Sequence, residues 1–169
     1  MSAYDQTSLE SLAAEVGRLL LANGQRLATA ESCTGGWVGQ CLTAVAGSSR
    51  WFERGFITYS NEAKLELLGV AADTLATHGA VSEATAAAMA LGALAHSHAD
   101  WALAITGVAG PEGGSPGRPV GTVCFAWAGP EGQLDTTSHR FQGDREAVRA
   151  QSVAHALAGL RQRAERRLA

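Results

Sequence analysis

The sequence has few charged residues, few aromatic residues and no long hydrophobic run. Charged residues make up 17% and aromatic residues 6% of the 169 residues. Because a disordered chain would be more polar and more highly charged, this composition indicates a folded protein whose core consists mainly of aliphatic side chains. No apolar run approaches the length of a bilayer span, which excludes a membrane-spanning helix. The length suits one domain, residues 1–169, with a core of its own.

The chain also lacks a signal peptide and a basic excess. Its first ten residues have neither the basic segment nor the apolar centre of a secretion signal. The formal net charge is −3, whereas nucleic-acid-binding proteins usually carry a basic excess that neutralises phosphates. The arginines between positions 161 and 167 are typical of a solvated helix end, with a tail that binds a partner as the alternative. We therefore expect no nucleic-acid partner and no membrane.

Neither the cysteines nor the histidines are spaced as metal ligands. Cys33, Cys41 and Cys124 form no CxxC pair, and an odd number does not suit a disulfide framework. Reduced thiols indicate a cytoplasmic protein. The five histidines show no ligand spacing, so we expect neither a metal site nor a cofactor.

The hydrophobic pattern predicts alternating helices and strands, followed by a late hairpin. Helices are expected over residues 7–23, 34–45, 60–69, 73–77, 82–97 and 144–169. Strands are expected over residues 26–31, 56–59, 101–105, 120–128 and 133–141. This order predicts an α/β protein, a three-layer α/β/α sandwich with a mixed, mostly parallel sheet and an antiparallel hairpin near its end. If the first three strands are parallel, the loops that follow them meet at one edge of the sheet.

The turn Glu31–Gly36 joins a predicted buried strand to the start of a helix. Free N–H groups and the helix dipole favour negative charge at such a position, so the turn can hold a phosphate or stabilise an oxyanion. Ser32 is then a candidate nucleophile, and Cys33 is a rival that has no evident histidine partner. From spacing alone, the favoured interpretation is that Ser32 or Thr34 simply caps the helix.

The segment Tyr59–Lys64 follows the next predicted strand. If Ser60 caps the helix, Lys64 lies one turn into it and its amine can reach back to the strand end. The helix dipole and burial both favour a neutral amine there, which could accept a proton from a serine. Taken alone, Lys64 is better interpreted as an exposed lysine and Tyr59 as a half-buried strand residue.

Two further segments carry residues suited to a nucleotide. The glycine-rich loop Thr106–Gly114 allows a ligand to approach the backbone and could cradle a phosphate or ribose, with a plain surface loop as an equal alternative. Arg145, in Gly143-Asp144-Arg145 at the start of the last helix, could bind a phosphate through two hydrogen bonds. A helix cap with a surface Asp–Arg pair is the slightly favoured alternative.

Together, these four motifs resemble the CinA C-terminal domain family, whose enzymatic members are PncC-type nicotinamide-nucleotide amidases. The resemblance covers nearly the whole chain and lies in the order and spacing of the motifs. It implies hydrolysis of the carboxamide of nicotinamide mononucleotide, without metal, to nicotinate mononucleotide and ammonia, in pyridine nucleotide salvage. It also implies a homo-oligomer.

The resemblance implies roles for individual residues. Ser32 would be the nucleophile, Lys64 the general base, and Tyr59 an assisting group. The nucleotide would be held by Thr106, Gly107, Gly110 and Arg145. We add the inference that N–H groups near Thr34 and Gly35 form an oxyanion hole. The alternatives are a module that binds a nucleotide without cleaving it, and an interaction protein of competence or DNA-damage responses.

Overall fold

The computed structural model describes residues 4–168 and centres on a five-stranded sheet of order β2-β1-β3-β4-β5. The strands are β1 (Leu27–Glu31), β2 (Phe52–Ile57), β3 (Trp101–Gly107), β4 (Thr122–Ala128) and β5 (Leu134–Arg140). Strand β1 pairs in parallel with β2 and β3, whereas β4 is antiparallel to both β3 and β5. Within the described sheet, β4 alone runs against the other strands. The predicted mixed sheet with a late hairpin is confirmed.

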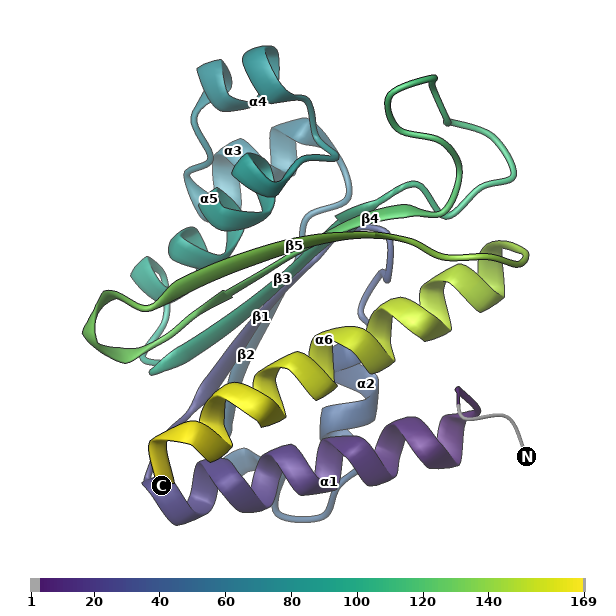
Figure 1. Cartoon of the computed structure of the whole chain (residues 1–169). Helices are drawn as coiled ribbons and strands as arrows, with labels where there is room; N and C mark the ends of the chain where they lie inside the picture. Colours follow the sequence, from purple (N-terminus) through teal and green to yellow (C-terminus); the bar gives the residue numbers. More distant parts are fainter. Residues whose placement is uncertain (1–3, 169) are drawn as a thin grey trace.

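Helices cover both faces of this sheet, as Figure 1 shows. The helices are α1 (Gln6–Asn23), α2 (Trp37–Thr43), α3 (Asn61–Leu68), α4 (Ala72–His78), α5 (Glu83–Ala95) and α6 (Arg145–Leu168), with short 3₁₀ turns at Ser48–Arg50 and Pro130–Gly132. Helices α1, α2 and α6 lie on one side, and α3, α4 and α5 lie on the other. The predicted three-layer arrangement is therefore confirmed. In residues 4–168, no helix combines the length and the hydrophobicity needed to cross a membrane.

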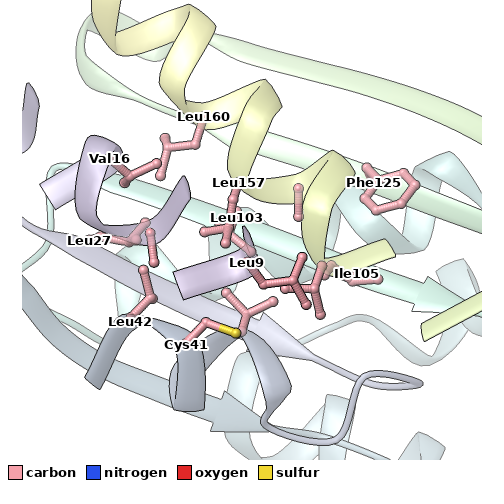
Figure 2. Packing of buried hydrophobic residues seen from close by; sticks show 14 of the residues in the cluster. Leu9, Val16, Leu27, Cys41, Leu42, Leu103, Ile105, Phe125, Leu157 and Leu160 are labelled. Atoms are coloured by element: carbon pink, nitrogen blue, oxygen red, sulfur yellow. The ribbon is translucent and has the colours of Figure 1, made fainter. Parts of the chain in front are cut away.

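The two faces of the sheet carry side chains of very different size. Towards α1 and α6, the strands present large residues, and Figure 2 shows Leu27, Leu103, Ile105 and Phe125 packed among the helix leucines. Towards α5, the same strands present small residues, namely Ala28, Ala30, Ala102, Ala104, Cys124, Ala126 and Ala128. Successive residues of a strand point to opposite faces. Because large and small residues alternate along the strands, the core between the sheet and α1 and α6 is built from large side chains. The core between the sheet and α5 is built from small ones.

Strand β2 differs from the prediction, which placed a strand over residues 56–59. The strand begins at Phe52 and ends at Ile57, and Tyr59 lies beyond its end with 63% of its surface exposed. Because β2 is an edge strand, Glu53 and Arg54 are tolerated in it, where they form an ion pair at 2.7 Å. These charges hide the hydrophobic alternation on which the prediction depended.

The helix after β1 also starts later than predicted, at Trp37 instead of residue 34. Gly35 and Gly36 have φ angles of 58° and 99°, in the left-handed region that interrupts a helix and favours glycine. Residues 32–36 consequently form an irregular turn between strand and helix. At the other end of the chain, α6 is described as far as Leu168, and Ala169, the last residue of the predicted helix, lies outside the described residues.

Candidate active site

A pocket of about 300 Å³ opens where β1, β2 and β3 end. This is the edge at which the loops after parallel strands were expected to meet. The residues of the predicted site that line the pocket are Ser32, Tyr59, Lys64, Thr106, Gly107, Gly110 and Arg145. The structure therefore brings together residues from four segments of the chain. Thr34 and Gly35 are not among the lining residues.

Ser32 and Lys64 are in direct contact at the base of this pocket. The Lys64 Nζ lies 3.0 Å from the Ser32 Oγ, and 2.8 Å and 3.4 Å from the carbonyl oxygens of Thr58 and Tyr59. Only 1% of Lys64 is exposed, and burial lowers its pKa. No carboxylate in the described part of the chain pairs with its amine. A neutral Lys64 can donate its two N–H groups to the two carbonyls and direct its lone pair at the Ser32 hydroxyl.

Local structure explains why Lys64 reaches the strand end. Ser60 is the N-cap of α3, and its hydroxyl accepts the N–H of Ala63 at 3.0 Å. The lysine side chain leans towards the helix N-terminus, as helical side chains do. The predicted N-cap and reach of Lys64 are confirmed, and its interpretation as an exposed residue is wrong.

Lys64 is also the single lysine of the chain, whose other basic residues, histidines aside, are arginines. An arginine side chain cannot lose its proton in a protein, whereas a buried lysine can. The isolation of one lysine among arginines is thus a sequence feature consistent with a neutral base, and it lies outside the local motifs.

The turn that carries Ser32 is held by a buried carboxylate beneath it. The Glu31 side chain accepts the Thr34 hydroxyl at 2.7 Å and the N–H groups of Val38 and Gly39 at 2.9 Å and 3.0 Å. Glu31 is only 2% exposed. The N–H groups of Val38 and Gly39 in α2 are therefore used within the protein and are closed to a phosphate.

The geometry changes which amides could form an oxyanion hole. The N–H of Gly35 donates to the Ser32 carbonyl at 3.0 Å, and the Thr34 side chain is fully buried against Glu31. Within residues 4–168, the amides of Cys33, Thr34 and Gly36 have no acceptor. Of the two expected donors, the Gly35 amide is thus occupied and Thr34 has no exposed surface, whereas Cys33, next to the candidate nucleophile, lines the pocket.

Cys33 lines the pocket but is a poor rival nucleophile. Burial raises the pKa of its thiol to about 12. The reactive form of a cysteine is the thiolate, which is scarce at neutral pH when the pKa is so high. The three cysteines are all free and buried. No group of three or more His, Cys, Asp and Glu side chains in the described residues is placed to hold a metal ion.

Arg145 connects the glycine-rich loop to Tyr59. Its Nη1 donates to the Gly110 carbonyl at 2.7 Å and its Nη2 to the Tyr59 hydroxyl at 3.0 Å. Gly110 has a φ of 86°, a conformation that favours glycine. The Thr106 hydroxyl donates to the Ala80 carbonyl at 2.7 Å. The exposed guanidinium of Arg145 therefore lies at the pocket, hydrogen-bonded to the glycine-rich loop. The loop itself is held in place by hydrogen bonds at Thr106 and Gly110.

Sequence reasoning missed other residues around the site. Ala80 and Val81, just before α5, line the pocket, and their small apolar side chains carry no chemical signal. Arg149 lies one turn beyond Arg145 in α6 and donates hydrogen bonds to the carbonyls of Cys33 and Thr34. The sequence showed the spacing of the two arginines but not which segment the second one contacts.

The site occurs within a stretch that matches known proteins. The model of the CinA C-terminal domain family matches residues 9–164. The chain is 55% identical over 151 residues to the nicotinamide-nucleotide amidohydrolase PncC of Escherichia coli K12, covering 89% of this chain and 92% of that protein. It is 48% identical over 154 residues to the protein of the same name from Pseudomonas putida, covering 91% and 96%. A solved structure of a competence-damaged protein (CinA) superfamily protein from Klebsiella pneumoniae has a TM-score of 0.90 at 48% identity, covering 94% of this chain and 98% of that one.

Proposed function

This chain belongs to the CinA C-terminal domain family, and from that premise we propose that it hydrolyses the carboxamide of nicotinamide mononucleotide. The products are nicotinate mononucleotide and ammonia, and the reaction serves pyridine nucleotide salvage. The observation that carries the proposal is the 3.0 Å contact between the buried amine of Lys64 and the Ser32 hydroxyl. An amide is a poor electrophile, so its hydrolysis needs such an activated nucleophile.

In the proposed mechanism, neutral Lys64 is the general base. Its lone pair takes the proton of Ser32 while the Oγ attacks the carboxamide carbon. The N–H group of Cys33, which lines the pocket, stabilises the negative oxygen of the tetrahedral intermediate. Lys64 then returns the proton to the leaving nitrogen, which departs as ammonia and leaves an ester on Ser32. Water, deprotonated by Lys64, hydrolyses this ester and releases the carboxylate product.

The nucleotide is held at the opposite side of the pocket. The Arg145 guanidinium binds the phosphate, and the backbone at Thr106, Gly107 and Gly110 contacts the ribose and phosphate. The Tyr59 hydroxyl accepts a hydrogen bond from Arg145, so Tyr59 orients that guanidinium and assists at the mouth of the site. The pocket volume of about 300 Å³ lies at the lower end of the range of small-molecule sites, roughly 300–1,000 Å³. Holding the substrate at both ends places its carboxamide carbon against Ser32.

The remaining expectations belong to the same proposal. We place the protein in the cytoplasm as a single domain, and its three free thiols suit that reducing compartment. It acts without a metal or a cofactor and binds no nucleic acid, which its net charge of −3 supports. Exposed apolar side chains such as Ile57, Leu67 and Leu91 support the homo-oligomer implied by the family, and sedimentation would measure it.

The decisive experiment measures ammonia release from nicotinamide mononucleotide by the purified protein after chelation of metals. Wild-type turnover that is lost in Ser32→Ala and in Lys64→Met, with both variants folded, would support the enzyme and its pair of catalytic residues together. If the wild type binds the nucleotide but releases no ammonia, the protein is a binding module and the proposal fails. Activity that survives Ser32→Ala would retain the reaction but would direct attention to Cys33.

A further inference from the structure

Glu112 is a pocket residue that the proposed mechanism does not use. Among the described residues that line the pocket of Ser32, it alone carries a carboxylate. Its side chain is exposed, and within residues 4–168 it forms neither an ion pair nor a side-chain hydrogen bond. Its two oxygens are therefore free to accept hydrogen bonds from a bound molecule.

The loop that carries Glu112 is anchored on both sides of it. On one side, the Gly110 carbonyl accepts a hydrogen bond from Arg145 at 2.7 Å. On the other side, the backbone at Gly114 runs so close to Val120 that an added Cβ would lie 2.8 Å from the Val120 nitrogen, an approach that glycine permits. Glu112 is thus presented at the pocket by a backbone with fixed neighbours.

These contacts place Glu112 on the side of the pocket where Arg145 lies. It stands two positions along the chain from Gly110, which binds Arg145. Ser32 and Lys64, in contrast, lie at the base of the pocket with exposed fractions of 8% and 1%. In the proposed complex the carboxamide lies at Ser32 and the phosphate at Arg145, so the ribose lies between these two ends.

We infer that Glu112 accepts hydrogen bonds from the ribose hydroxyls and makes the site selective for a ribonucleotide. The inference rests on the proposed amide hydrolysis, which makes nicotinamide mononucleotide the ligand. The phosphate of that ligand is itself negative, its pyridinium nitrogen carries no hydrogen, and its carboxamide is held at Ser32. The two adjacent ribose hydroxyls are the remaining donors. A carboxylate accepts hydroxyl groups strongly because it is charged, and acidic side chains bind ribose hydroxyls in this way in dinucleotide-binding folds.

Attraction between Glu112 and the positive pyridinium ring is the competing account. The ring is bonded directly to the carboxamide, whose carbon must come within about 3.5 Å of the Ser32 Oγ for attack. The ring therefore lies near the base of the pocket, whereas the Glu112 carboxylate is exposed. Solvent weakens the interaction of such an exposed charge with a distant one.

The test measures binding by calorimetry in a Ser32→Ala background, in which the nucleotide is not consumed. The two ligands are nicotinamide mononucleotide and its 2′,3′-dideoxy analogue, which keeps the pyridinium and the phosphate. Glu112→Ala and Glu112→Gln are compared with Glu66→Ala. Glu66 is also exposed and has no side-chain partner in residues 4–168, and it lies outside this pocket. Glu66→Ala therefore makes the same change in net charge.

We expect Glu112→Ala to raise the Kd for nicotinamide mononucleotide roughly 10- to 100-fold, through loss of hydrogen bonds to a charged acceptor. Its Kd for the dideoxy analogue should stay within about threefold, since that ligand offers no hydroxyl to Glu112. Glu112→Gln should bind the natural nucleotide with intermediate affinity, because an amide oxygen still accepts a hydroxyl. Glu66→Ala should change neither Kd, and thermal unfolding checks that every variant is folded.

Three results would overturn the inference and leave the proposed function intact. An equal rise in Kd for both ligands in Glu112→Ala would assign Glu112 to the pyridinium. Unchanged or tighter binding of both ligands would show that the carboxylate contacts neither ribose hydroxyl. A Glu112→Gln variant that binds no better than Glu112→Ala would contradict the hydrogen bond. The opposite case is also distinct, because binding with the expected dependence on Glu112, without ammonia release by the otherwise wild-type protein, would refute the proposed function alone.

Discussion

The two helical layers that enclose the sheet contribute in different ways to the site between them. In the layer of α3, α4 and α5, α5 packs on a sheet face made mainly of alanines, and α3 supplies Lys64, the proposed base. The layer of α1, α2 and α6 packs on large side chains and supplies the charged groups, Arg145 and Arg149. Small side chains allow α5 to lie close to the sheet, and α3, which packs against α5 and β2, carries Lys64 to the strand end. Large side chains leave more distance, which long arginines can span.

The largest expected effect comes from variants that remove the proposed base, Lys64, from the layer of α3, α4 and α5. Lys64→Arg replaces the neutral amine with a permanent cation of similar length that cannot release its proton, and Lys64→Met keeps the volume without any base. Both should lower kcat/KM for nicotinamide mononucleotide by roughly 10²–10⁴-fold, the usual contribution of a general base. The measurement is ammonia release, with Glu66→Gln on the same short helix as a control that should keep wild-type activity.

The pKa of Lys64 provides an independent measurement of the same claim. Burial lowers it below the ordinary value of 10.5, so the neutral base is present at lower pH than for an exposed lysine. The value of kcat/KM should therefore rise with pH and level off before pH 10.5. Because the chain has one lysine, selective isotopic labelling of lysine gives one side-chain signal whose titration can be followed by NMR. A midpoint at or above 10.5 would contradict the proposed base.

The next effect is on the face with large side chains. Leu103→Ala leaves a cavity between the sheet, α1 and α6, and should lower the free energy of unfolding by about 2–5 kcal/mol. Its neighbour in the strand points to the other face, where Ala104→Gly removes a single methyl group and should cost roughly 1–2 kcal/mol. Urea unfolding of the two variants measures the difference. Equal losses would show that the two faces contribute alike.

A smaller effect tests how closely the other layer packs. A Cβ atom at Gly92 of α5 would collide with the backbone oxygen of Leu68 at the end of α3. Gly92→Ala should therefore lower the free energy of unfolding by about 1–3 kcal/mol through overpacking. The control is Gly117→Ala, because a Cβ at Gly117 has no neighbour within 4 Å. Since α3 carries Lys64, Gly92→Ala should also reduce kcat, and a stable, fully active variant would contradict this account.

The smallest effect is the pH dependence of the folded protein's stability that arises from His155, on the side of the sheet with large side chains. Burial, together with His139 and Arg163, lowers the pKa of His155 to about 4. Its folded pKa lies below its unfolded value, so the folded state is favoured while His155 is neutral. The resulting stability is complete above about pH 6.5 and decreases as the pH falls towards 4. His155→Gln should make thermal stability less sensitive to pH across that window, whereas an unchanged pH dependence would assign the effect to other groups.

Much of the fold could be predicted because its inner strands are buried on both faces. Strands β1, β3 and β4 are buried along almost their whole length, and Ser60 and Ser82 are recognisable helix caps. Strand β2 could not be placed well, because an edge strand tolerates Glu53 and Arg54. Local sequence signals therefore locate elements best where both faces are covered.

The candidate site was predicted only in part, for a different reason. Ser32, Lys64 and Arg145 stand in recognisable local motifs, so their positions could be expected to converge. Arg149, in contrast, contacts Thr34 across a separation of 115 residues, and no local pattern encodes that contact. The Gly35 amide is used by the Ser32 carbonyl, a detail of turn geometry that spacing does not contain.

Because the single lysine of the chain is buried, its chemical labelling can measure how often the site opens. A reagent that acylates amines finds one side-chain target in the whole chain, and that target is 1% exposed. In the folded state it should therefore react slowly, whereas each transient opening of α3 away from the strand ends exposes it. The rate at which the peptide that contains Lys64 gains an acyl group, followed by peptide mass spectrometry so that the terminal amine is counted separately, then measures how often the site opens. A bound nucleotide should slow that rate.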